Sequence, residues 1–126
     1  MTDSLEAGIG LLNTTTGVDM KTVQKNTLYT VPPGKTAYVT HVVIRETSAS
    51  LAGGTDYDIG TGANADTWKQ TNNLADMTTA GTDVRVIDTN NATLTDNAAG
   101  SVFGIKPITG STGAATATID VFGFLA

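Results

Sequence analysis

The chain has 126 residues, a length that fits one ordinary domain with one hydrophobic core. Twelve acidic and seven basic side chains give a net charge of -5, which argues against a nucleic-acid partner because binding to phosphates relies on Lys and Arg. The absence of Cys excludes disulfides, zinc thiolate sites and thiol catalysis, and no apolar run is long enough to span a bilayer.

The composition indicates an all-β protein. Charged residues make up only 15% of the chain, compared with about 25% in typical soluble domains. Hydroxyl and amide side chains supply the polarity instead. Thr is the commonest residue and has a branched Cβ that suits strands, whereas the 14 Gly residues, with Asn and Asp, suit turns.

Residues 1–26 show no sustained hydrophobic period, and we predict an extended N-terminal arm there, followed by a β-sandwich domain at 27–126. A disordered terminus is the alternative, but the segment is more apolar than disorder usually permits, so we expect part of it to bind another surface. The residues that make it so include Ile9, Leu11, Leu12, Val18 and Val23. The acidic start lacks the basic region of a signal peptide, which favours synthesis in a cytoplasm without export by that route.

The strongest strand signal lies at 35–45, after a short strand at 27–31 and the turn Pro32-Pro33-Gly34. Gly34 is expected to take the positive φ of a type II turn. With strict alternation, one face of the long strand carries Tyr38, Thr40, Val42 and Ile44, and the other carries Ala37, Val39, His41 and Val43. Both faces are largely apolar, so we expect one to meet the core and the other to meet a second layer or another subunit.

The middle of the chain alternates strands with long loops. Residues 56–59 are predicted as a strand, and 60–82 as an ordered excursion that has room for a short helix at 67–77. The side chains expected to point inward from that excursion are Trp68, Leu74 and Met77.

Further strands are predicted at 83–88, 101–106 and 115–125, with Val84 and Val86 facing inward. The last strand places Ala117, Ile119 and Val121 on one face and Thr116, Thr118 and Asp120 on the other. Its apolar end, Phe122-Gly123-Phe124-Leu125, is expected to pack into the core or an interface. About six to eight strands in all predict an antiparallel β-sandwich or jelly roll, with a small closed barrel as the alternative.

Few residues suggest chemistry. His41 is the only imidazole, and we interpret it as a hydrogen-bonded histidine at an interface or core edge. The best set of oxygen ligands for calcium comprises Asp56, Asp58, Asn64 and Asp66. This set does not match the EF-hand pattern, and the solvent face of a strand is the alternative. Because no base and nucleophile arrangement is legible, we expect no enzyme activity and no cofactor.

Two stretches, VPPGKTAYVTHVVIRETS and ATIDVFGFLA, together with the Gly/Thr/Asn-rich loops and the absence of Cys, resemble the small β-sandwich virion proteins of tailed bacteriophages. The resemblance covers about residues 27–126 and is greatest to capsid decoration, or cement, proteins. It implies a structural protein of the virion surface that is made in the host bacterial cytoplasm. Such a protein would bind the major capsid protein as a homotrimer and bridge coat subunits, using an extended arm.

The predicted subunit or capsid interface comprises Ile9, Leu11, Leu12, Val18, Tyr38, Val39, His41, Val43, Phe122 and Phe124. An alternative function is a receptor- or glycan-binding domain of a phage tail or head fibre. That function requires an exposed aromatic and amide cluster, for which Tyr57, Asn64 and Trp68 are the candidates. A hydrolase is the third and least favoured hypothesis.

Overall fold

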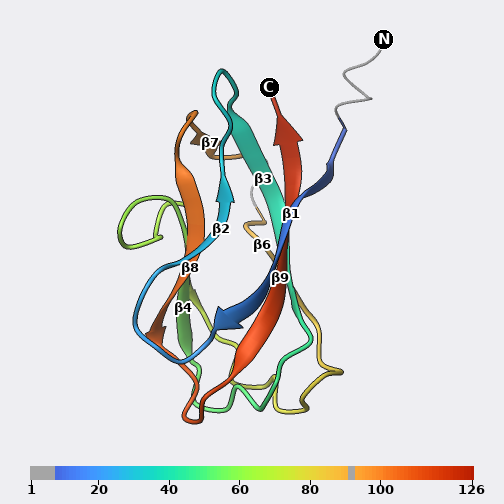
Figure 1. Ribbon diagram of the computed structural model, residues 1–126, viewed down its shortest axis with the longest axis vertical. Helices are drawn as coiled ribbons and strands as arrows, with labels where there is room; N and C mark the ends of the chain where they lie inside the picture. Colours follow the sequence, from blue (N-terminus) through green and yellow to red (C-terminus); the bar gives the residue numbers. More distant parts are fainter. Residues whose placement is uncertain (1–7, 91–92) are drawn as a thin grey trace.

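Two antiparallel sheets face each other in the computed structural model, which describes residues 8–90 and 93–126 (Figure 1). Sheet A has the order β1-β9-β3-β6, with β7 beside β3, and comprises β1 (Gly10–Asp19), β9 (Thr116–Leu125), β3 (Ala37–Arg45), β6 (Arg85–Asp88) and β7 (Asp96–Asn97). Sheet B has the order β2-β8-β4-β5 and comprises β2 (Asn26–Thr30), β8 (Val102–Thr109), β4 (Asp56–Gly60) and β5 (Lys69–Asn72). The prediction of an all-β antiparallel sandwich is confirmed, and the narrower jelly roll stays a prediction.

The hydrophobic core lies between the two sheets. Sheet A contributes Val39, Val42, Ile44, Ile119 and Val121, and sheet B contributes Leu28, Tyr57, Ile59, Phe103 and Ile105. The loop residues Trp68, Leu74 and Met77 are also buried, as predicted. Trp68 packs edge-on against Phe103, with the ring centroids 5.8 Å apart.

The predicted helix at 67–77 is wrong. Residues Lys69–Asn72 form strand β5, whose register places Asn72 opposite Tyr57. Thr71 has a φ of +56°, which a right-handed helix cannot accommodate. Residues 8–90 and 93–126 contain no helix, and therefore none that is long and apolar enough to cross a membrane.

The predicted boundary between arm and sandwich is also wrong. Residues 10–19 form β1, which pairs antiparallel with β9 from its first residue to its last. Val18 and Met20, on and just after this strand, are only 2% and 0% exposed. This part of the predicted arm therefore supplies both backbone pairing and core surface. Residues 1–7 of the predicted arm lie outside the described residues.

A β-bulge at Thr40 divides strand β3. Strand β9 pairs Gly123 with Val39 and the adjacent Phe122 with His41, so Thr40 is an extra residue without a partner on β9. The side chains that reach the core are Ala37 and Val39 before the bulge and Val42 and Ile44 after it. Strict alternation is therefore wrong for this strand. The core takes apolar residues from both of the predicted faces.

Side chains stabilise the bulge from both sides of the sheet. The indole nitrogen of Trp68 donates a hydrogen bond of 3.1 Å to the carbonyl oxygen of Val39, inside the core. The hydroxyl of Thr40 donates a hydrogen bond of 3.2 Å to the carbonyl oxygen of Phe122. Backbone groups that the interrupted ladder would leave unpaired are thus satisfied, as buried polar groups must be.

Strand β6 has the opposite orientation to the prediction. Val84 and Val86 are 59% and 57% exposed, whereas Ile87 is only 5% exposed. The register explains this arrangement, because Ile87 lies opposite the core residue Val42 and Val86 lies opposite Val43. Val86 therefore belongs to the side of sheet A that is turned away from sheet B.

Two local predictions are confirmed. Gly34 has a φ of +74°, and the amide of Lys35 donates to the carbonyl oxygen of Pro32 across 3.3 Å, which closes the turn before β3. On β9 the predicted inward residues Ala117, Ile119 and Val121 are all buried.

A methyl group on Gly123 would lie 2.0 Å from the carbonyl oxygen of Tyr38, so β3 and β9 would have to separate at the bulge. We expect Gly123→Ala to lower the free energy of unfolding by roughly 1–3 kcal/mol, the usual cost of overpacking, as measured by urea denaturation. Gly113→Ala is the control, because nothing lies within 4 Å of an added Cβ there. Equal stability of the two variants would contradict the close approach of the strands.

Candidate functional site

The outer face of sheet A, the side turned away from sheet B, carries most of the predicted interface residues. The register of the strands arranges its side chains in rows. One row comprises Leu11, Phe122, His41 and Asp88, and the next comprises Thr14, Asp120, Val43 and Val86. We call Tyr38, His41, Phe122 and Phe124 the aromatic end of this face, and Thr14, Arg45, Glu46 and Asp120 its charged end.

Two stacked ring pairs join β3 to β9 at the aromatic end. The centroids of Tyr38 and Phe124 are 5.1 Å apart with an interplanar angle of 19°. Those of His41 and Phe122 are 4.6 Å apart with an angle of 5°. The hydroxyl of Thr40 lies 3.0 Å from His41 Nδ1 and fixes the orientation of the imidazole. All four rings are only half-buried, so this chain does not cover them completely.

Exposed aliphatic side chains extend the aromatic end toward both edges of the sheet. Leu11 on β1 is 56% exposed and lies opposite Phe122, and Val86 on β6 is 57% exposed and lies opposite Val43. A groove of about 330 Å³ lies near the start of β1 and the end of β9, with Leu11, Lys35 and Phe124 among its lining residues. Aromatic and aliphatic side chains gathered in this way are typical of protein-binding surfaces.

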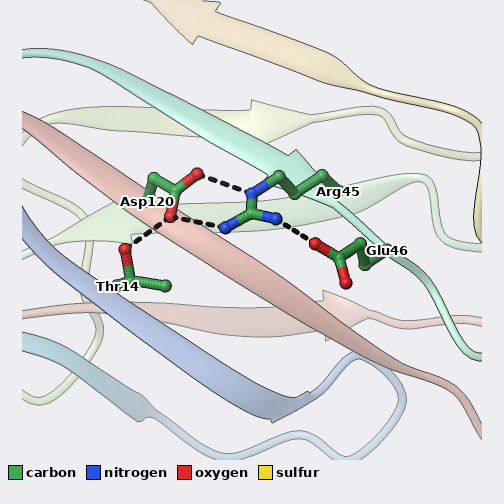
Figure 2. A network of polar contacts seen from close by, with 4 residues as sticks. All are labelled: Thr14, Arg45, Glu46 and Asp120. Atoms are coloured by element: carbon green, nitrogen blue, oxygen red, sulfur yellow. Dashed lines mark hydrogen bonds and ion pairs between the residues drawn. The ribbon is translucent and has the colours of Figure 1, made fainter.

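A hydrogen-bond network links three strands at the charged end, as Figure 2 shows. Arg45 donates from Nε to Asp120 Oδ2 across 2.8 Å and from Nη2 to Asp120 Oδ1 across 3.3 Å. Thr14 donates its hydroxyl to Asp120 Oδ1 across 2.7 Å, and Arg45 also pairs with Glu46. These hydrogen bonds, led by that from Arg45, hold the pKa of Asp120 below its ordinary value of 3.8 even though burial opposes the charge.

The predicted interface residues have three different outcomes. Those that lie together on the outer face are Leu11, Tyr38, His41, Val43, Phe122 and Phe124. Ile9 is 61% exposed just before β1, and Leu12 packs partly against the core. Val18 and Val39 are 2% and 1% exposed in the core, so the prediction that they contact another subunit is wrong. Val86 was missed because a four-residue strand is too short to show its phase.

Two of the four candidate calcium ligands have other side-chain contacts. Asp58 accepts the amide of Thr71 across 2.9 Å, and Asn64 Oδ1 accepts a hydrogen bond of 3.3 Å from the ammonium group of Lys106. Burial, followed by the neighbouring Asp58, raises the pKa of Asp56. Within residues 8–90 and 93–126, no three acidic or imidazole side chains come close enough to hold a metal ion, so Asp56, Asp58 and Asp66 do not form such a group.

The cluster proposed for glycan binding is not an exposed platform. Tyr57 and Trp68 are 0% and 7% exposed, and only Asn64 of the three lies on the surface. The hydroxyl of Tyr57 donates to the carbonyl oxygen of Met20 across 2.7 Å, and burial raises the pKa of Tyr57 to about 12. The prediction of this particular cluster is therefore wrong, because both aromatic rings are needed to fill the core.

A polar cleft of about 380 Å³ opens between the edge strands β5 and β6. The ammonium group of Lys69 donates to the carbonyl oxygen of Asp88 across 2.7 Å, and Arg85 Nη1 donates to the carbonyl oxygen of Asn73 across 3.0 Å. Lys69 therefore links β5 to β6, and Arg85 links β6 to the residue that follows β5. Lys69 thereby binds the carbonyl group of the last residue of the short edge strand β6.

Comparisons with protein-family models, with curated protein sequences and with solved structures found no match. The side chains of the outer face are therefore the only guide to what it binds. Half-buried rings, exposed aliphatic side chains and a fixed charged network are groups that bind a protein surface by burial and charge pairing.

Asp120→Asn removes the charge that Arg45 and Thr14 stabilise. We expect a loss of roughly 1–3 kcal/mol at pH 7, as for a hydrogen bond to a charged group, measured by urea denaturation. Because the pKa of Asp120 is lowered on folding, its contribution is complete above the ordinary value of 3.8 and is lost as the pH falls through the folded value. The difference between the wild type and the variant should therefore shrink in acid.

The control is Asp66→Asn, which changes an exposed carboxylate outside the network. It should leave stability unchanged at both pH values. A stability difference for Asp120→Asn that is the same at pH 7 as below the folded pKa would show that the network does not depend on the ionised carboxylate.

Proposed function

We propose that this protein is a non-enzymatic structural protein that attaches to a larger protein assembly through the outer face of sheet A. The observation that carries the proposal is the continuity of this face: Leu11, the two ring pairs, Val43 and Val86 lie next to one another across four strands. Burying such a face against a partner is favourable by about 25 cal/mol for each Å² of apolar area, before the costs of association.

The setting that we propose is the surface of a tailed-phage capsid, where the protein would act as a decoration protein. It would bind the major capsid protein as a homotrimer and bridge coat subunits. The support is that the two stretches resembling phage virion proteins include β3 and β9, the strands that carry both ring pairs. In this proposal the outer face makes the bridging contact, because residues 10–19 of the predicted arm belong to the sandwich.

The test measures the solution mass by light scattering and then co-sedimentation with empty shells of the phage that encodes the protein. We expect a trimer that sediments with the shells. Leu11→Ser combined with Val86→Ser should weaken shell binding about tenfold or more, because both side chains lie exposed beside the aromatic end.

The matched control combines Val23→Ser with Ile108→Ser. These two apolar residues are 61% and 39% exposed but lie in the loop after β1 and on sheet B. The control variant should bind shells as the wild type does. A monomer that ignores shells would refute the decoration role, and equal binding by both double variants would refute the role of the outer face.

A further inference from the structure

We propose that the outer face of sheet A fits a foreign protein surface whose apolar centre is surrounded by Lys or Arg, and not a second copy of this chain. The inference rests on the proposed function and specifies the chemistry of the partner at the same surface. Two observations lead to it: an apolar centre that spans the sheet, and carboxylates that border this centre.

The apolar centre comprises Leu11, the aromatic end, Val43 and Val86, and it crosses sheet A diagonally, from one row on β1 to the adjoining row on β6. The row through His41 begins at Leu11 on β1, and the adjoining row ends at Val86 on β6. Within each ring pair the two rings stack on each other, so they are held in place before any partner binds. A partner gains apolar contact with little loss of side-chain freedom in these rings, which favours binding.

Carboxylates border this centre. Asp88 on β6 lies opposite His41, and Asp96 on β7 lies opposite Tyr38, so both share the outer face, and both are exposed. Glu46 at the charged end has a side chain that is 61% exposed. Two cations lie near this surface. Arg45 is already paired with Asp120 and Glu46, whereas Lys35 is exposed and lines the groove beside Leu11 and Phe124.

These charges decide between the possible occupants. A second copy docked face to face would add the same exposed carboxylates to the interface, in a chain whose net charge is already -5. Like charges across an interface disfavour association, whereas a rim of Lys or Arg would pair with Asp88 and Asp96. Guanidinium groups can also lie against the aromatic rings Tyr38 and Phe124. The proposed trimer would then be built through other surfaces.

The first experiment selects binders from a random dodecapeptide library displayed on yeast, using the folded wild-type protein as bait. The Leu11→Ser/Val86→Ser variant serves for counter-selection, so that only peptides that need the outer face remain. We expect the selected peptides to combine aromatic or aliphatic residues with a net positive charge. Their affinity should fall as salt is raised from about 50 mM to about 500 mM, since salt screens exposed charges.

The second step measures the affinity of a selected peptide for two charge variants. Asp88→Asn/Asp96→Asn should weaken binding about three- to tenfold, as expected for the loss of two exposed ion pairs. Asp66→Asn/Asp83→Asn is the matched control, because Asp83 and Asp88 each accept a loop amide and the net charge changes equally. The control should bind as the wild type does.

Peptides without net positive charge, an absence of binders that depend on the outer face, or equal effects of the two charge variants would overturn the inference. So would self-association of the wild type that Leu11→Ser/Val86→Ser abolishes, measured by sedimentation velocity. Failure of the decoration role gives a different result: the basic peptides bind the outer face while the shells do not bind.

Discussion

Thr40 has no partner on β9, and this one unpaired residue determines which side chains of the central strand β3 reach the core. A strand of even alternation would send Val39 and Val43 to the same side, but the bulge sends Val39 inward and leaves Val43 on the outer face. The bulge persists because its surroundings are shaped for it. Gly123 lets the two backbones approach closely, and Trp68, from the opposite side of the core, binds the carbonyl group that the bulge redirects. Core packing and the outer face therefore depend on the same local feature.

The charged end stabilises a carboxylate that has little access to water on the central strand β9. Asp120 lies on the outer face of β9, yet flanking side chains leave it only 7% exposed. A carboxylate with so little access to water requires partners, since burial of an unpaired charge is costly. Arg45 and Thr14 supply them from the strands on either side, so β1, β9 and β3 are cross-linked by one carboxylate (Figure 2). Together with the ring pairs at the other end, this network fixes the outer face at both ends before anything binds to it.

Local chemistry determined what the sequence could predict. The turn at Gly34 and the alternation of β9 needed no knowledge of distant residues, and both are present. Phe122 and Phe124 were predicted to pack into the core or an interface because an apolar chain end is unusual, and both lie half-buried on the outer face. The bulge could not be predicted, since its cause includes Gly123, far along the chain. Strand β1 was hidden because its pairing with β9 shifts register twice, which obscures a two-residue period. The phase of Val86 is set by its pairing with β3, and that pairing leaves no mark on the sequence of β6.

Because of the bulge, the apolar residues on both predicted faces of β3 do not by themselves indicate an interface. Apolar residues on both sides of an evenly alternating strand would require a second layer, but in β3 the core itself accounts for Val39, Val42 and Ile44. Fewer apolar residues are left for an interface: the rings of the aromatic end, Val43, and the exposed Leu11 and Val86 at the two edges. Neither edge residue belongs to β3, so their position beside the rings is independent of the pattern that first suggested an interface. The case for a binding surface therefore rests on the agreement of several strands of sheet A, from β1 to β6, and no longer on the composition of β3 alone.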